Sequence, residues 1–212
     1  MRKRVRNDEC LLCYKSLIKG IDLYHLIVDD TICFKCRSKL ERKLSISKFN
    51  GYRLISFYDY GEEISKLIIR YKDLFDIPLA SVFLKEYMWL INTLFKDYQI
   101  ILIPSSKKMQ KRRGFNHLKL MLSDCKLEVI DLFEKEDSVQ RFKKDRSLSD
   151  FKLKYPPNNL DKVIIFDDVI TSGTSVLNAI NSISKYCQKI VIITVAKNLK
   201  KKETYARKSK VV

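Results

Sequence analysis

The segment that most constrains the fold is residues 163–175, which read VIIFDDVITSGTS. Four apolar residues at its start predict a buried strand, and Asp167 and Asp168 follow directly. A turn of small hydroxyl residues around Gly173 comes next, and the apolar spacing of residues 175–187 predicts a helix. A buried strand that leads into a helix through a short turn is typical of α/β proteins with a parallel sheet.

The same alternation of strands and helices covers most of the chain. Further strands are predicted at 52–60, 98–103, 127–133 and 190–195, and further helices at 64–71, 80–95 and 114–124. Two segments, 105–113 and 134–159, are charged, lack apolar periodicity and are predicted to be loops. The 212 residues therefore suit a small N-terminal module (1–50, ending in a polar run at 45–50), one α/β domain (51–200) and a basic tail (201–212).

Four of the six cysteines form two C-x2-C pairs that are separated by nineteen residues: Cys10, Cys13, Cys33 and Cys36. This spacing is typical of a structural Zn²⁺ site, in which four thiolates fill all tetrahedral positions. The alternative is two disulfides, which a cytosolic location would disfavour. Basic residues after the second pair could offset the thiolate charge: Lys35, Arg37, Lys39, Arg42 and Lys43. Cys125 and Cys187 are interpreted as small buried residues.

The charge of the chain points to a polyanionic partner. Lys and Arg total 42 against 25 Asp and Glu, a formal net charge of +17, which favours nucleic acid or an anionic surface. The apolar runs are too short for a membrane span, and no apolar signal core follows the basic start, so a cytoplasmic protein is expected. No G-x-x-x-x-G-K-[ST] motif occurs, which argues against an ATP-driven motor.

The turn after the predicted strand combines hydrogen-bond donors with acceptors. The backbone N–H groups of residues 171–175, at the start of a helix, form a concavity that suits an anion, and Gly173 permits close approach of a phosphate. Hydroxyl groups add donors from Thr171, Ser172, Thr174 and Ser175. Asp167 and Asp168 can accept hydrogen bonds from a ribose diol. The combination predicts a ribose-5-phosphate site; the alternative for an isolated Asp-Asp pair is a solvated turn.

A second group of candidate contacts lies in the predicted basic loop at 105–113. Arg112 and Arg113 could bind pyrophosphate or a nucleic-acid backbone, as could Lys107, Lys108 and Lys111. The alternative is a solvated loop. Three aromatic residues of the N-terminal module could stack on bases or pack inside the module: Tyr14, Tyr24 and Phe34. His25 and His117 are interpreted as ordinary polar residues.

The ordered combination of these features is similar to one known family. VIIFDDVITSGTS resembles the 13-residue phosphoribosyl pyrophosphate (PRPP) motif of type I phosphoribosyltransferases. The four-cysteine module, a loose Y-G-x-x-x-x-L-I match from Tyr60 to Ile68 and the R-G-F-N of Arg113 to Asn116 precede it, so nearly the whole chain resembles the ComF (ComFC) competence family. The chain departs from the family pattern in three places: His117 replaces the usual Gln, the proline-rich opening is Ile103-Pro104-Ser105-Ser106, and the Q…R…N segment is matched only by Gln140 and Arg146.

The resemblance implies a type I phosphoribosyltransferase-like domain at 51–200. In that family pattern Asp167 and Asp168 bind the ribose hydroxyls, the 171–175 loop binds the 5-phosphate, and Mg²⁺ accompanies PRPP. The implied function is that of a cytoplasmic accessory factor of natural transformation, which binds incoming single-stranded DNA and acts with a ComFA-like DEAD-box helicase.

Two other functions compete with that reading. One is an active phosphoribosyltransferase that transfers ribose 5-phosphate from PRPP to a nitrogen nucleophile, although a zinc module stands where a base-reading hood is needed. The other is a PRPP-sensing regulator of duplex DNA, which ranks last because no clear helix-turn-helix occurs.

Overall fold

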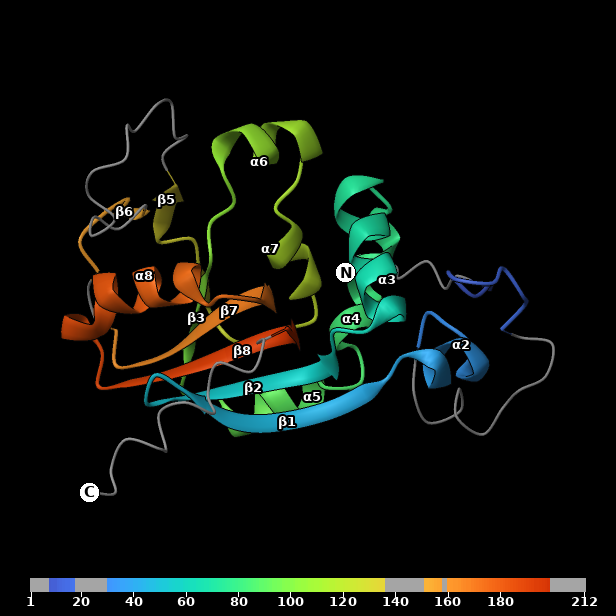
Figure 1. The fold of residues 1–212 in the computed structure, drawn as a ribbon, viewed down its shortest axis with the longest axis horizontal. Coiled ribbons are helices and arrows are strands. Elements are labelled where there is room, and N and C mark those ends of the chain that lie inside the picture. Colours follow the sequence, from blue (N-terminus) through green and yellow to red (C-terminus); the bar gives the residue numbers. More distant parts are fainter. Residues whose placement is uncertain (1–7, 18–29, 136–150, 158–159, 199–212) are drawn as a thin grey trace, which may run out of the picture.

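A six-stranded sheet forms the centre of the molecule (Figure 1). The structure is a computed structural model, and it describes residues 8–17, 30–135, 151–157 and 160–198. The strands of this sheet are β1 (Arg42–Phe49), β2 (Tyr52–Asp59), β3 (Gln99–Leu102), β4 (Val129–Ile130), β7 (Lys162–Ile170) and β8 (Lys189–Lys197). Their order is β1-β2-β8-β7-β3-β4.

Helices connect the strands in the manner expected of a parallel sheet. Within the six-stranded sheet all neighbouring strands are parallel except β1 and β2, which pair in antiparallel fashion. The helical elements are α2 (Phe34–Lys39), α3 (Glu62–Asp73), η1 (Ile77–Leu79), α4 (Ala80–Leu84), α5 (Met88–Leu94), α6 (Lys107–Arg113), α7 (His117–Met121), α8 (Thr174–Ile183) and η2 (Ser184–Tyr186). The predicted fold class, an α/β domain with a parallel sheet and a small N-terminal module, is confirmed.

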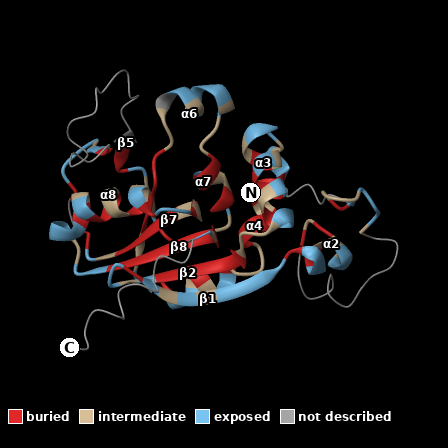
Figure 2. Ribbon diagram, viewed as in Figure 1, coloured by how far each residue is buried: buried red, intermediate tan, exposed pale blue. Residues whose placement is uncertain are grey.

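The two central strands of the sheet are almost entirely buried (Figure 2). Strands β7 and β8 read as near-continuous apolar runs because helices cover both faces of a parallel sheet. Strand β7 is longer than predicted. It continues through Asp167 and Asp168 to Ile170, where it still pairs with Lys197 of β8. The two aspartates therefore lie within the strand and not in the turn after it.

Residues 42–49, which the sequence analysis placed inside the N-terminal module, form an edge strand of the central sheet. Strand β1 pairs with β2 from Arg42↔Tyr58 to Phe49↔Tyr52, and the turn between them uses Gly51 at φ +88°. Most of β1 is exposed, in contrast to its neighbours (Figure 2). This strand was not predicted because most of its residues are polar. An edge strand needs only part of one face to be apolar, so it shows no apolar run in the sequence.

Segment 105–113 was predicted to be a loop, and this prediction is wrong. It contains helix α6, which begins after Ser106, whose Oγ accepts a hydrogen bond from Met109 N at 3.3 Å. The helix ends at Gly114, which adopts φ +73° and donates its N–H to Gln110 O. Both residues are standard helix boundary signals, and Lys, Met, Gln and Arg between them are good helix formers.

Other predicted elements differ from the structure in their extent, among them the helix predicted at 114–124, of which α7 covers only His117–Met121. The helix predicted at 80–95 is divided into α4 and α5 by a turn at residues 85–87. The strand predicted at 127–133 becomes the short β4 and the start of β5 (Phe133–Lys135). Strand β5 pairs with β6 (Phe151–Leu153) in a separate antiparallel ribbon, within the segment predicted to be a loop. Every helix in the described parts of the chain is too short or too polar to cross a bilayer.

Some expectations concern residues outside the described ranges. These are the basic tail at 201–212, Tyr24 and His25 in the N-terminal module, and Gln140 and Arg146 of the partial Q…R…N match.

Candidate functional site

Two loops that the sequence analysis selected lie at one edge of the sheet. Strands β3 and β7 are parallel neighbours, so the segment after each strand lies at the same, carboxyl edge. After β3 the chain forms α6, and after β7 it forms the 171–175 loop and α8 (Figure 1). One side of the molecule therefore carries Asp167 and Asp168 (the acid pair), residues 171–175 (the hydroxyl loop) and the basic helix α6.

The hydroxyl loop has the geometry of an open helix start. Helix α8 begins at Thr174, so the N–H groups of its first turn have no acceptor within the helix. Thr171, Ser172 and Thr174 are exposed, and the hydroxyls of Ser172 and Thr174 lie 3.0 Å apart. Such backbone and hydroxyl groups at a helix start are hydrogen-bond donors of the kind that bind an anion.

Gly173, within the hydroxyl loop, packs directly against the edge strand β1. It has φ +73°, and a Cβ built on it would lie 2.1 Å from Cζ of Phe49 at the end of β1. No other residue type fits without displacement of the Phe49 ring. The sequence analysis gave Gly173 a role in phosphate approach, and the structure adds this packing contact with Phe49.

The two aspartates have opposite electrostatic environments. Burial and the neighbouring Asp168 raise the pKa of Asp167 well above its ordinary value. Although burial opposes it, the contacts with His117 and Lys72 lower the pKa of Asp168 below its ordinary value. Oδ1 of Asp167 accepts the Asp168 N–H at 2.9 Å, and Oδ1 of Asp168 accepts the Val169 N–H at 2.8 Å.

The remaining oxygen of Asp168 contacts two residues that the sequence analysis did not select. Nζ of Lys72, at the end of α3, lies 2.5 Å from Asp168 Oδ2, and Nε2 of His117, at the start of α7, lies 3.5 Å from it. His117, which the sequence analysis interpreted as an ordinary polar residue, is buried beside Asp168, and burial lowers its pKa, which favours the neutral ring. No local pattern points to Lys72. His117 could have been suspected because it directly follows R-G-F-N.

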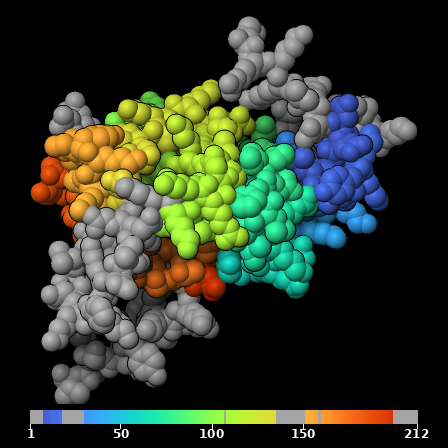
Figure 3. All heavy atoms as spheres, turned by 90° about the horizontal axis from the view of Figure 1, so that it is seen from above, coloured from blue at the N-terminus to red at the C-terminus, as the bar shows by residue number. Residues whose placement is uncertain are grey.

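Helix α6 contributes two arginines with different environments. The side chain of Arg113 is only 7% exposed; its Nε donates to Lys72 O at 3.2 Å, and its Nη2 lies 3.7 Å from Asp73. Arg113 therefore joins α6 to the end of α3. Arg112 is exposed, as are Lys108 and Lys111. In the space-filling view α6 (yellow-green) lies beside α3 (teal), and the N-terminal module (blue) lies at the far side of α3 (Figure 3).

The four cysteines of the two C-x2-C pairs come together as predicted. The Sγ atoms of Cys10, Cys13, Cys33 and Cys36 all lie within 4.8 Å of one another, and those of Cys13 and Cys33 are 3.7 Å apart. A tetrahedral zinc with Zn–S bonds of about 2.3 Å requires S–S separations of about 3.8 Å. The cluster therefore fits one such ion, and all six cysteines of the chain are free thiols.

The surroundings of the cluster bear on the charge of its thiols. The Lys15 N–H lowers the pKa of Cys13 to about 7, whereas burial raises the pKa of Cys33 and of Cys36. Backbone N–H groups of Leu12 and Cys33 donate to the Cys10 sulfur. A bound cation is needed to keep all four sulfurs ionised at neutral pH.

Arg37 does not serve as a free counter-charge to the thiolates, which corrects the expectation for this residue. It is completely buried, and its guanidinium makes two bonds with the carboxylate of Asp30, at 2.8 and 2.6 Å. Its Nη1 donates to Val82 O of α4 at 2.8 Å and lies 3.4 Å from Tyr58 Oη of β2. Arg37 therefore fastens the N-terminal module to the α/β domain.

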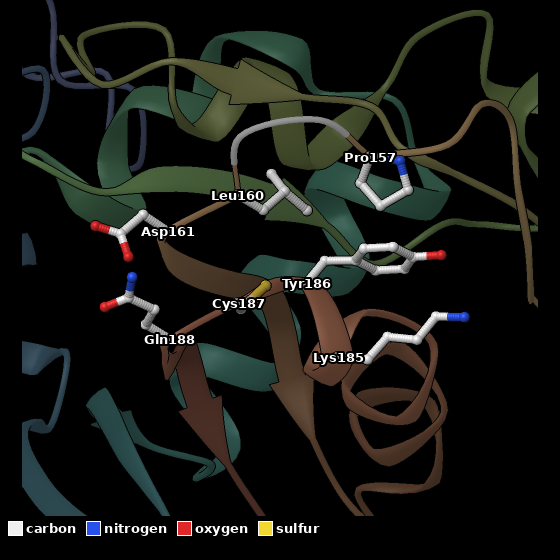
Figure 4. A pocket seen from close by; sticks show the side chains of 7 residues that line it. All are labelled: Pro157, Leu160, Asp161, Lys185, Tyr186, Cys187 and Gln188. Carbon is white, nitrogen blue, oxygen red and sulfur yellow. The ribbon is translucent and has the colours of Figure 1, made fainter.

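A separate cavity of about 500 Å³ lies at the opposite edge of the sheet (Figure 4). Its lining comes from the residues that precede β7 and β8: Pro157, Leu160, Asp161, Lys185, Tyr186, Cys187 and Gln188. Ligands of parallel α/β sheets bind beyond the carboxyl ends of the strands, and this cavity is at the amino ends. We therefore locate the candidate site at the acid pair and not in this cavity.

Comparison with known proteins gives relatives over most of the chain. The chain is 24% identical over 198 residues to competence protein ComFC of Streptococcus pneumoniae, which covers 79% of this chain and 90% of the relative. It is 23% identical over 203 residues to competence protein ComFC of Bacillus subtilis, which covers 78% and 84%. The resemblance to the ComFC competence proteins is confirmed.

No protein-family model matches the chain. Among solved structures, orotate phosphoribosyltransferase from Aeropyrum pernix is similar at 15% identity with a TM-score of 0.35, covering 77% of this chain and 90% of that one.

Proposed function

We propose that the chain is a competence factor in which a PRPP-type ribose-5-phosphate pocket lies beside a surface for single-stranded DNA. The observation that carries the proposal is the convergence at one sheet edge of the acid pair, the hydroxyl loop and the basic helix α6. The similarity to ComFC over about four fifths of the chain supports the assignment to DNA uptake. A cytoplasmic location and a ComFA-like helicase partner belong to the same proposal.

In the proposed pocket each group has a role that suits its chemistry. The N–H groups and hydroxyls of the 171–175 loop bind the 5-phosphate, because they are donors at a helix start. Asp167 and Asp168 accept hydrogen bonds from the ribose hydroxyls. The closeness of Gly173 to Phe49 keeps the loop in the conformation that exposes these donors.

The proposed DNA surface is built on the exposed cations of α6. Lys108, Lys111 and Arg112 are exposed, and the net charge of +17 favours association with a polyanion. Contacts of this kind bind phosphates without reading the base sequence and weaken as salt rises. Arg113 is excluded from this role because its side chain is committed to α3.

We also propose that Zn²⁺ occupies the four-cysteine cluster and has a structural role. Four thiolates would fill the tetrahedral coordination, which leaves no position for a reacting water. The zinc then stabilises the segment that carries Arg37, and through it the contact between the module and the α/β domain.

The DNA proposal is tested by fluorescence anisotropy with a labelled oligothymidine. The Lys111→Gln/Arg112→Gln variant should bind more weakly and lower the slope of log K against log salt by about 1.4, since each phosphate contact on a single strand contributes about 0.7. The matched control is Lys185→Gln/Lys189→Gln, which removes two exposed cations at the opposite sheet edge. Equal affinities and slopes for the two variants would reject α6 as the DNA surface.

A further inference from the structure

The acid pair offers little room for the divalent cation that usually accompanies PRPP. Three of its four carboxylate oxygens already have partners: Oδ1 of Asp167, Oδ1 of Asp168 and Oδ2 of Asp168. Mg²⁺ binds oxygens at about 2.1 Å in octahedral geometry, usually one or two carboxylates together with waters and substrate phosphates. The Lys72 ammonium lies 2.5 Å from Asp168 Oδ2, so a divalent ion at this oxygen would be repelled by a second positive charge. The residues present therefore do not fit Mg²⁺ at Asp168.

We propose that Lys72 is the resident cation of this site and supplies, at Asp168, the positive charge that a divalent ion would otherwise provide. The inference rests on the proposed function, because it concerns how the same pocket binds a phosphosugar. Its consequence is that ribose 5-phosphate binds without a divalent cation, and that its negative charge is balanced by Lys72 together with the N–H groups of the 171–175 loop.

The position of Lys72 is fixed by the elements around it. Its backbone carbonyl accepts the Arg113 Nε–H at 3.2 Å, and the neighbouring Tyr71, which is fully buried, donates its hydroxyl to His117 O at 2.7 Å. The Lys72 side chain is 22% exposed, so the ammonium is accessible from the site while it remains paired with the nearly buried Asp168. A cation that is held in place before the ligand arrives loses little entropy when the ligand binds.

The local charge balance agrees with this assignment. His117 is 3.5 Å from Asp168 but favours its neutral form, so it does not supply the compensating charge. The guanidinium of Arg113 is directed to Asp73 and the end of α3. Among the described residues, Lys72 is thus the cation that contacts the acid pair.

The first test measures binding of ribose 5-phosphate by calorimetry in EDTA and in millimolar Mg²⁺. The wild type should give the same Kd in both buffers, within about twofold. Lys72→Gln should weaken binding about tenfold or more in EDTA, the size expected when one charge-assisted contact is lost, and Mg²⁺ should restore part of it. Lys66→Gln, an exposed lysine of the same helix, is the matched control and should behave as the wild type.

The second test asks about the cation directly and does not need the phosphosugar. Water-proton relaxation with Mn²⁺ alone should detect no ion at the acid pair of the wild type, whereas Lys72→Gln should gain a weak site that Lys72→Gln/Asp168→Asn lacks. If Lys72→Gln folds poorly because the Asp168 carboxylate has lost its partner, the double variant avoids this, since it removes both charges.

The outcomes separate the two proposals. Wild-type affinity for ribose 5-phosphate that rises tenfold with Mg²⁺, or Mn²⁺ binding by the wild type that Asp168→Asn abolishes, would overturn the role of Lys72. Absence of ribose 5-phosphate binding in both buffers would instead reject the proposed pocket, and the Mn²⁺ experiment would still decide whether Lys72 excludes a metal ion from Asp168.

Discussion

Arg37 is the single side chain that most clearly connects the two parts of the molecule. It lies one residue after a cysteine of the cluster, is completely buried, and bonds to Asp30 within the module and to Val82 in the α/β domain. A buried ion pair adds little net stability over an apolar pair of the same volume, but removal of one partner leaves an uncompensated buried charge. The cost of a substitution here should therefore be large.

We expect Arg37→Met to lower the free energy of unfolding by about 3–5 kcal/mol, because Asp30 would remain buried without its partner. The measurement is urea unfolding followed by circular dichroism. Lys43→Met, which breaks an exposed pair with Asp59, is the control and should cost about 1 kcal/mol or less. Equal losses for the two variants would contradict the role of Arg37.

At the residue scale, the sequence predicts which residues could form a site better than it predicts which residues contact one another. The metal-binding cysteines follow from their spacing, because a tetrahedral site restricts which spacings can work. The partners of Arg37 and Lys72 do not follow, since Val82 and Asp168 are brought to them by packing between distant elements. For the same reason His117 could not be assigned to the acid pair from its neighbours in sequence.

At the scale of elements, the edge strand β1 and the hydroxyl loop depend on each other. Phe49 ends β1 and covers Gly173, so the strand that the sequence analysis missed helps to set the shape of the candidate phosphate site. Strand β1 and helix α6 were missed for a common reason: both are too polar to show apolar periodicity, and tertiary contacts and capping decide their structure.

Gly173→Ala should destabilise the protein more than Gly114→Ala does. Both glycines have φ +73°, so each substitution carries the left-handed cost of about 1–2 kcal/mol, but only the Cβ at 173 meets the Phe49 ring. The collision should add about 1–3 kcal/mol, and Phe49→Leu should recover part of it in the double variant. Thermal unfolding of the wild type, the two single glycine variants and Gly173→Ala/Phe49→Leu measures these stability differences. Equal losses of stability at Gly173 and Gly114 would show that the Phe49 contact is unimportant.

At the scale of the whole molecule, the buried parallel strands were the most predictable feature. Their apolar runs have few alternative structures, and parallel connection limits the topology to a few arrangements. The N-terminal module is different, because the roughly 40 residues before β1 have too small a core to fold without a metal or a similar constraint. Its stability should therefore depend on the four-cysteine cluster.

We expect the purified chain to contain one zinc per molecule, and its removal by a chelator to lower Tm by at least about 5 °C, equivalent to about 2 kcal/mol or more. Elemental analysis and differential scanning fluorimetry provide the measurements. Cys36→Ser should lose the metal, and Cys125→Ser, which lies outside the cluster, should retain it. A metal-free chain with unchanged Tm would rule out a structural zinc.

The proposed PRPP pocket is tested by calorimetric titration of the zinc-loaded protein with PRPP, with and without Mg²⁺, beside the Asp167→Asn/Asp168→Asn variant. We expect binding by the wild type, a stabilisation of about 2.7 kcal/mol at a hundredfold excess of ligand over Kd, and loss of both in the variant. No heat and no stabilisation in the wild type, or equal binding by the variant, would contradict the account and leave the acid pair and hydroxyl loop as part of the scaffold alone.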